Sequence, residues 1–183
     1  MAKETLVILA EGFEDIEAVT PIDILRRAKI DVTVAALKDV KVTGARGVTI
    51  IADKRLDDAG ADFDALILPG GSRGAENLAA SAGVRSLIMA MHKKGKVIAA
   101  ICAAPAVVLA PTGILNGKQA TCYPGMESAF DKTTRFKADD VVVDGAIITS
   151  RGPATALAFS LAIVEKLAGR EEAEKVRKAT LAR

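Results

Sequence analysis

The sequence GKVIAAICAAPAVVLAP, residues 95–111, places a candidate nucleophile, Cys102, at the end of an apolar run. Residues 97–102 have the composition of a buried strand, and the residues after Cys102 predict a helix. Ala100 and Ala104 give the small-x-nucleophile-x-small pattern of a tight strand-to-helix turn. A thiol in the first turn of a helix meets the positive end of the helix dipole. We therefore expect the pKa of Cys102 to lie below its ordinary value, so that the side chain is a reactive thiolate.

The alternative for Cys102 is a buried and unreactive cysteine, which is the common state of free cysteine. The neighbouring motif LPGG favours a functional role. It ends in Gly70 and Gly71, whose backbone N–H groups are not shielded by side chains. The N–H of Gly71 and that of Ala103 could together stabilise an oxyanion or an oxygen bound to sulfur. A plain turn explains two glycines equally well, so this prediction depends on the cysteine nearby.

Carboxylates follow the first predicted strand, and Glu17 differs from the others. We expect Glu14 and Asp15 to lie on a solvated helix face, where they interact favourably with the helix N-terminus. Glu17 stands between Ile16 and Ala18, on a side of the helix that can face inward. A carboxylic acid buried beside a thiol has a raised pKa and can exchange protons with a substrate.

The position of the single histidine, His92, argues against an amidotransferase and against papain-type hydrolysis. It lies at a predicted helix end, before the strand that leads to Cys102, and five strand residues place it about 15 Å away at the opposite sheet edge. One chain therefore cannot assemble a Cys–His dyad, and a histidine-rich zinc site is excluded as well. The other cysteine, Cys122, has no metal-binding or thioredoxin-type spacing from Cys102.

Short apolar runs alternate with longer amphipathic stretches, which predicts a parallel sheet with helices on both faces. The strands are expected at 5–10, 32–37, 64–71, 97–102 and 145–150, with weaker edge or hairpin strands in VTIIADK and VVVDG. Helices are expected at 23–29, 86–95 and 155–169. Pro21 interrupts a helical pattern, and we favour one kinked helix over a new turn that starts at Thr20. The carboxyl ends of the strands, where ligands bind in such sheets, carry the glycines, carboxylates and thiol described above.

Composition sets the remaining limits. A chain of 183 residues has room for one substantial core, so we expect a single domain over residues 1–183. Basic and acidic residues are interleaved at a net charge of +2, which gives no basic stripe for nucleic acid. The N-terminal apolar run is too short for a signal peptide or a membrane span. These features predict a cytoplasmic protein with no membrane or nucleic-acid partner.

The segments LVILAEGFEDIEAVTPIDILRRA, LILPGG, AAICAAPAVVLA and ITSRGPATALAFSLAIVEKL together resemble the ThiJ/PfpI superfamily, in particular the branch of the parkinsonism-associated deglycase. The resemblance covers nearly the whole chain in order. It implies a flavodoxin-like doubly wound sheet and a homodimer without cofactor or metal. It also implies that Cys102 is the nucleophile, Glu17 its protonated partner, and Gly71 and Ala103 the backbone donors. The pocket residues that it implies are Gly70, Tyr123, Pro153, Arg27 and Arg46.

The chain departs from some members of that superfamily in TCYPG, where Tyr123 stands in place of a pocket histidine before Pro124. A tyrosine is a poor base at neutral pH, so we expect proton transfer to depend on Glu17. The same alignment puts Cys122 near the pocket, where it is either a thiol that resolves a sulfenic acid or, as we favour, a bystander.

Two functions are open at this point. The resemblance favours a cofactor-free enzyme that converts dicarbonyls such as methylglyoxal, or their protein and nucleotide adducts, into hydroxy acids. The alternative is a redox sensor or oxidative-stress chaperone that acts through oxidation of Cys102. A flavin or phosphate site in GGSRG is a weak third possibility, because the loop lacks the spacing of a phosphate loop.

Overall fold

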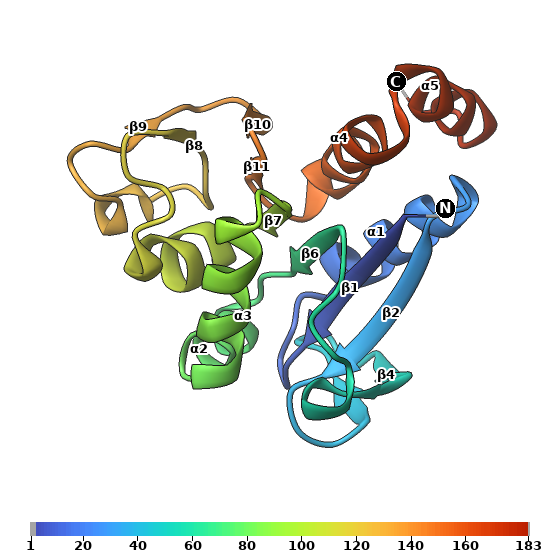
Figure 1. Cartoon of the computed structure of the whole chain (residues 1–183), viewed down its shortest axis with the longest axis horizontal. Helices are drawn as coiled ribbons and strands as arrows, with labels where there is room; N and C mark the ends of the chain where they lie inside the picture. The colour runs from blue at the N-terminus through green and yellow to red at the C-terminus, as the bar shows by residue number, and fades with distance from the viewer. Residues whose placement is uncertain (1–2, 183) are drawn as a thin grey trace.

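The computed structural model describes residues 3–182 and contains a central seven-stranded sheet (Figure 1). Its parallel core is β1 (Glu4–Leu9), β2 (Asp31–Ala36), β6 (Ala65–Leu68), β7 (Val97–Ile101) and β11 (Ile147–Ser150). The spatial order β2-β1-β6-β7-β11 is the 2-1-3-4-5 order of a flavodoxin-like doubly wound sheet. The predicted fold class is therefore confirmed.

Short strands complete the sheet and add two ribbons. The edge strands are β10 (Val141–Asp144), antiparallel to β11, and β5 (Lys54–Arg55), parallel to β2. The ribbons are β3 (Lys41–Thr43) with β4 (Thr49–Ile51), and β8 (Gln119–Ala120) with β9 (Arg135–Phe136). The two weaker sequence predictions were thus right, since one strand lies in a hairpin and the other at an edge.

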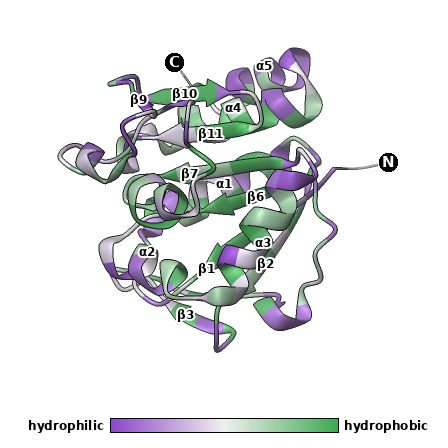
Figure 2. Ribbon diagram, turned by 60° about the vertical axis from the view of Figure 1, so that its left-hand side comes forward, coloured by the Kyte–Doolittle hydropathy of each residue, from purple (hydrophilic) through white to green (hydrophobic). Residues whose placement is uncertain are grey.

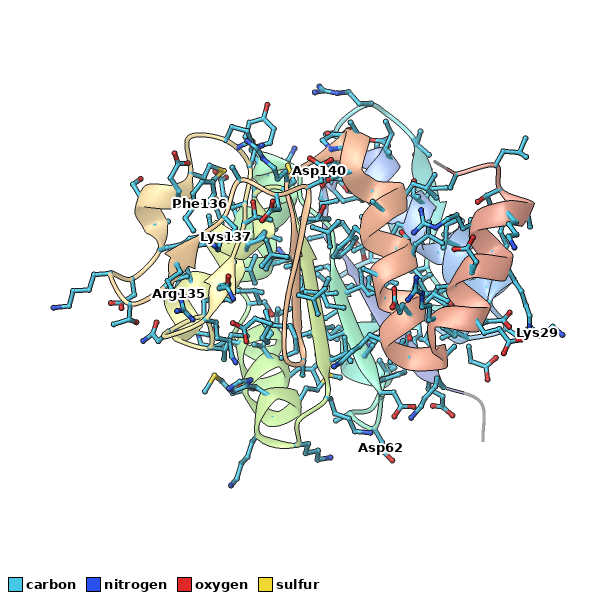
Figure 3. All side chains as sticks on the ribbon, turned by 90° about the horizontal axis from the view of Figure 1, so that it is seen from above. Lys29, Asp62, Arg135, Phe136, Lys137 and Asp140 are labelled. Carbon is cyan, nitrogen blue, oxygen red and sulfur yellow. The ribbon has the colours of Figure 1, made fainter. Side chains whose placement is uncertain are left out.

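Helices cover both faces of the sheet. They are α1 (Asp15–Arg27), α2 (Ser72–Ala79), α3 (Ala82–Lys93), α4 (Ala156–Ala168) and α5 (Arg170–Ala179). Helices α1, α4 and α5 pack together on one face, while α2, α3 and the turn after Cys102 cover the other (Figures 1 and 3). Short helical turns occur at Leu56–Asp58, Pro105–Leu109, Ala110–Thr112, Glu127–Ala129 and Pro153–Thr155.

Helix α1 continues through Pro21 as one element, as we favoured. Proline has no N–H to donate to the carbonyl four residues earlier, which belongs to Glu17. The helix is nevertheless held against the sheet by its buried face, which includes Ala18, Ile24 and Leu25. Packing of this face is what offsets the cost of an interior proline.

The core consists almost entirely of aliphatic side chains. All residues of β6 and β7 are buried, and the strands stand out as hydrophobic in Figure 2. Two buried phenylalanines, Phe13 and Phe159, are among the largest core side chains. A sheet buried on both faces needs apolar residues at successive positions rather than alternation, which explains the continuous apolar runs in the sequence. Within residues 3–182, no helix has both the length and the apolar character to cross a membrane.

Candidate active site

Cys102 follows β7 directly and has a backbone φ of 64°. This left-handed conformation is uncommon for a residue with a side chain, and it costs about 1–3 kcal/mol that the surrounding structure must offset. Here both backbone groups are fixed: the N–H donates to Ser150 O at 2.9 Å, and the carbonyl accepts from Tyr123 N at 2.8 Å. A π-helical turn, Pro105–Leu109, then starts within a few residues. The predicted tight turn is therefore present at the cysteine.

Glu17 lies in the first turns of α1 and is fully buried. Its Oε2 accepts a hydrogen bond from Gly70 N at 2.9 Å. Its Oε1 is buried without a hydrogen-bonded partner among residues 3–182. Burial raises the pKa of Glu17 to about 7, although the nearby Cys102 side chain and the N–H of Gly70 act in the opposite direction. The predicted inward-facing carboxyl group with a raised pKa is confirmed, and it exchanges protons easily at neutral pH.

The pKa of Cys102 does not follow the prediction. Burial, and after it the negative charge of Glu17, raise the pKa of the thiol to about 12, although the N–H groups of Gly71 and Ala103 act in the opposite direction. The helix-dipole argument was wrong because it left out the cost of placing an anion in a buried site next to a carboxylate. The cysteine is therefore a thiol at rest, and Glu17 is the neighbouring group that can accept its proton.

The backbone donors are where the sequence predicted them. The N–H groups of Gly71 and Ala103 both act on the Cys102 side chain, where they lower the pKa of the thiol. Gly71 has a φ of 85°, and a Cβ there would collide with the carbonyl oxygen of Gly12 and lie 2.7 Å from Glu14 N. Only glycine lets the loop after β6 approach the loop after β1 this closely.

A cleft of about 590 Å³ opens above the cysteine at the carboxyl ends of β1, β6 and β7. It includes the point between β1 and β6 where the strand order reverses, the usual ligand position in this class of sheet. Six predicted site residues line the cleft, namely Arg46, Gly71, Cys102, Ala103, Tyr123 and Pro153. Cys102 is 8% exposed, so its sulfur is accessible from the cleft but largely enclosed.

Two predicted pocket residues lie elsewhere. Gly70 is packed behind the cleft, between Glu17 and Cys102, and supports the pair instead of contacting the cavity. Arg27, which the resemblance placed near the dimer side of the entrance, does not line this cleft: it is at the last turn of α1, pairs with Asp23 at 2.7 Å and lines a different cavity between α1, the start of α4 and the end of α5. Helix α1 is 13 residues long, so its last turn lies away from the carboxyl edge of the sheet where the helix begins. The resemblance in sequence could not show this distance.

The prediction for Asp15, which we expected on a solvated helix face, was wrong. The side chain is buried and accepts hydrogen bonds from Arg46 N and Val48 N, both at 2.9 Å. These bonds hold the β3–β4 loop, whose residues 43–46 form one wall of the cleft. No local signal marked this burial, because Asp15 and Glu17 are two residues apart and such residues point to different sides of a helix.

Cys122 is fully buried and, like Cys102, is a free thiol. Burial raises its pKa to about 11, so it is not an activated nucleophile. His92 lies at the end of α3, before β7, and so stands at the sheet edge opposite the cleft. No cluster of three potential metal ligands occurs in the described part of the chain.

The fold and site define a class of α/β protein in which a cysteine on a strained turn lines a cleft and a buried glutamate lies beside it. A family model named the DJ-1/PfpI family matches residues 3–166, and the chain belongs to that family. This finding confirms the resemblance drawn from the sequence.

Relatives and solved structures agree with this assignment. The chain is 44% identical over 184 residues to Drosophila melanogaster Protein dj-1beta, covering 99% of this chain and 98% of the relative. It is 36% identical over 178 residues to the Glutathione-independent glyoxalase DJR-1.2 of Caenorhabditis elegans, with 96% and 95% covered. The crystal structure of Drosophila DJ-1beta superposes with a TM-score of 0.95 at 44% identity and full coverage of both chains. Oxidised Toxoplasma gondii DJ-1 gives a TM-score of 0.95 at 39% identity, with 98% of each chain covered.

Two other relatives are longer. Protein DJ-1 homolog B and homolog A of Arabidopsis thaliana are 45% and 43% identical over 180 residues, or 97% of this chain. The chain spans only 41% and 46% of their lengths.

Proposed function

We propose that this chain is a cofactor-free glyoxalase that converts methylglyoxal-like ketoaldehydes into hydroxy acids. The observation that carries the proposal is the arrangement at Cys102: the thiol and Oε2 of Glu17 both pack against Gly70, and the N–H groups of Gly71 and Ala103 lower the pKa of the thiol. A relative of similar length that is named a glutathione-independent glyoxalase supports it.

The first step is addition of the thiol to the aldehyde. The carboxylate of Glu17 accepts the proton of Cys102 while the sulfur bonds to the aldehyde carbon, and the proton then passes to the carbonyl oxygen. The N–H groups of Gly71 and Ala103 stabilise negative charge that develops beside the sulfur. The product is a hemithioacetal, and Glu17 is again ionised and ready to act as a base.

The second step moves a proton within the substrate. Glu17 removes the proton from the carbon bonded to sulfur, giving an enediolate, and returns it to the neighbouring carbon, while the hydroxyl proton on the first carbon passes to the oxygen of the second. The first carbon is thereby oxidised to a thioester and the second is reduced to an alcohol, so no external oxidant or reductant is needed. Water hydrolyses the thioester, which releases the hydroxy acid and restores the thiol of Cys102.

The same pocket could accept an adduct of the dicarbonyl with an amine or thiol and release that group, which would be deglycase activity. We place this second, because nothing in the cleft distinguishes a free ketoaldehyde from its adduct. We also propose a homodimer. Exposed apolar side chains of α1, Ile16 at 53% and Val19 at 46%, support a partner surface on that helix, and sedimentation would test it.

The test is turnover of methylglyoxal, with the hydroxy acid identified as the product, by wild type, Cys102→Ser and Glu17→Gln. Both variants should lose at least about a hundredfold in kcat/KM, the usual size of a general acid–base contribution. Because Glu17 acts first as a base, wild-type kcat/KM should rise with pH through about 7. Full turnover by either variant would overturn the mechanism.

The alternative role is a redox sensor or stress chaperone through oxidation of Cys102. It is supported by the backbone donors, which would stabilise a sulfinate, and by the solved oxidised form of Toxoplasma DJ-1. The raised pKa of Cys102 counts against rapid oxidation, because the thiolate is the form that reacts. Mass spectrometry after mild peroxide would reveal two added oxygens on Cys102 if this role applies.

A further inference from the structure

A second cavity of about 330 Å³, the side cavity, adjoins the cleft. Its floor includes the buried residues Leu9, Ala10 and Val42, at the end of β1 and in β3. Glu11 and Arg73 line both the side cavity and the cleft. The two spaces are therefore neighbours, and Arg73 stands at the boundary between them.

The side-chain stem of Arg73 packs against Gly12 at this boundary. Gly12 has a φ of 83°, and a Cβ at that position would lie 2.8 Å from Cβ of Arg73 and 3.1 Å from its Cγ. The arginine stem thus occupies the space that a side chain on residue 12 would take. This contact fixes the direction of the stem, while the guanidinium group at its end stays exposed.

The charges around the side cavity leave an excess of one cation. Its lining has three basic residues, Lys38, Lys41 and Arg73, and two acidic residues, Glu11 and Asp39. Within residues 3–182 none of these three cations forms an ion pair. Oε2 of Glu11 already accepts a hydrogen bond from Thr43 N at 3.0 Å.

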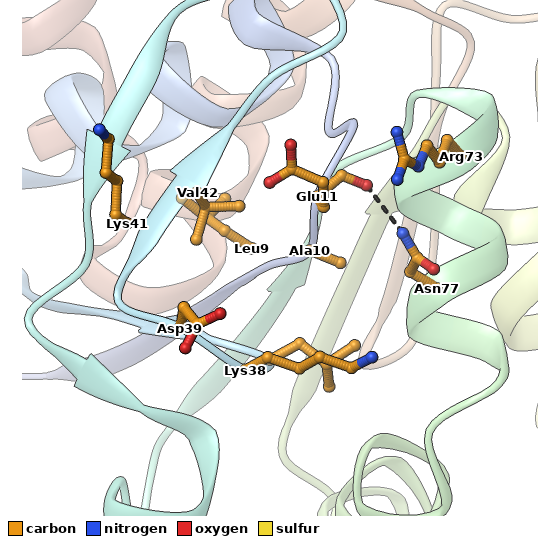
Figure 4. A pocket seen from close by; sticks show the side chains of 10 residues that line it. Leu9, Ala10, Glu11, Lys38, Asp39, Lys41, Val42, Arg73 and Asn77 are labelled. Carbon is orange, nitrogen blue, oxygen red and sulfur yellow. Dashed lines mark hydrogen bonds between the residues drawn. The ribbon is translucent and has the colours of Figure 1, made fainter.

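The cations are not evenly placed. Figure 4 shows Arg73 beside Asn77 on the α2 side of the side cavity, with the Lys38 side chain extending toward that side. Asp39 and Lys41 lie on the opposite side of the view. The Asn77 side chain is fixed by a hydrogen bond from Nδ2 to Glu11 O at 2.9 Å. A ligand near Arg73 therefore meets its guanidinium group and the Asn77 amide, with Lys38 and Glu11 also in the lining of the side cavity.

We propose that Arg73 is a specificity-determining residue that binds a carboxylate on the substrate, so that the preferred substrates are ketoaldehydes whose chain ends in an acidic group. This inference rests on the proposed function, because it assigns a substrate class to that reaction. An arginine fork matches a carboxylate in a bidentate manner. One excess positive charge in the side cavity suits a monoanion better than a doubly charged phosphate.

The experiment compares two probes with the same carbon chain, one charged at its end and the other neutral. One is the ketoaldehyde that carries a carboxyethyl group in place of the methyl group of methylglyoxal, and the other is the methyl ester of that acid. In wild type at low salt, kcat/KM for the acid should exceed that for the ester by at least about tenfold. The ratio should fall as salt is added, because exposed charges are screened beyond about 10 Å at 0.1 M ionic strength.

Variants assign the preference to one residue. Arg73→Met keeps an apolar stem over Gly12 and removes the charge, so the acid-to-ester ratio should fall about tenfold. Arg73→Lys should restore part of the ratio, since the charge returns without the fork. Arg170→Gln, on exposed α5, is the matched control and should leave the ratio unchanged. A wild-type ratio near one, or a ratio that Arg73→Met does not change, would overturn the proposal.

A binding measurement separates this proposal from the proposed function. The hydroxy diacid formed from the acidic probe is titrated by calorimetry into wild type, Arg73→Met and Cys102→Ser. We expect Arg73→Met to bind it about tenfold more weakly, and Cys102→Ser to bind it like wild type. If no ketoaldehyde is turned over but this difference persists, the proposed function fails and the carboxylate site stands. If turnover is normal and the difference is absent, the carboxylate site fails alone.

Discussion

Gly70 donates its backbone N–H to Oε2 of Glu17 at 2.9 Å. The same residue leaves no room for a side chain, because an added Cβ would lie 2.6 Å from Cβ of Cys102 and 2.7 Å from Oε2 of Glu17. The glycine therefore sets the distance between the acid and the thiol, because both side chains pack against the backbone of Gly70. This arrangement fixes the geometry before any substrate arrives.

Gly70→Ala should disrupt this spacing. The new methyl group would also lie 2.9 Å from Ile101 O, which belongs to a central strand and cannot easily move. We expect a loss of about 1–3 kcal/mol in the free energy of unfolding, typical of overpacking, and a loss of methylglyoxal turnover. Urea denaturation and a turnover assay would measure both.

Gly83→Ala is the control for that substitution. A Cβ on Gly83 has only Ser81 Oγ nearby, at 3.7 Å, and the residue lies in α3. It should keep or slightly raise stability, because alanine favours the helix. If Gly70→Ala behaved in the same way as this control, the spacing argument would be wrong.

The raised pKa of Glu17 predicts how stability depends on pH. The folded protein retains the proton of Glu17 up to about 7, whereas the unfolded chain releases it near 4.5. The folded state therefore binds more protons in this window, and the free energy of unfolding falls as the pH rises from 4.5 to 7. A difference of that size corresponds to about 3 kcal/mol.

Urea denaturation of wild type and Glu17→Gln across this pH window isolates the effect. Other groups titrate equally in both proteins, so the difference between their profiles belongs to Glu17. The variant should lack the decline and be the more stable of the two at pH 8. Parallel profiles would show that burial does not perturb this carboxyl group.

Alkylation of Cys102 by iodoacetamide tests the charge coupling of the pair. The charge of Glu17 raises the pKa of Cys102, second only to burial. Glu17→Gln removes that charge, so above pH 7 the variant should alkylate faster than wild type while losing turnover. Cys122, which is fully buried and lacks this coupling, serves as the internal reference, read by mass spectrometry of the peptides. Slower alkylation in the variant would contradict the direction of the coupling.

Asp15 should prove to be a positioning residue for the cleft. Asp15→Ala removes the acceptor of two backbone hydrogen bonds from the β3–β4 loop, which should destabilise the fold by about 1–3 kcal/mol. The freed loop carries Arg46, so KM for methylglyoxal should rise more than kcat falls. Asp23→Ala, which breaks an exposed ion pair with Arg27, is the comparison and should change neither constant much. A fall in kcat with an unchanged KM would instead indicate that Asp15 has a direct role in the chemistry.

Local sequence determined most of the fold. The apolar runs of β1, β6 and β7 are long, uninterrupted and separated by helical stretches, and only a parallel sheet covered on both faces buries them. The turn at Cys102 was also local, because the small residues around it permit a strand to pass directly into a helical turn. The short helix α2 was not expected, since its GGSRG start has the composition of a loop.

Only the tertiary structure decided those features of the site that depend on burial and on contacts between residues far apart in sequence. The pKa of Cys102 depends on its enclosure and on a carboxylate from α1, and a helix-dipole argument based on neighbours in sequence gave the wrong direction. Arg27 and Arg46 were equally plausible in the sequence, but the length of α1 carries one away while a loop tied to Asp15 brings the other to the cleft. The periodicity of a sequence indicates which face of a helix or strand is buried. It does not indicate the charge and packing of the residues that cover that face, and these determine the pKa and reactivity of the buried groups.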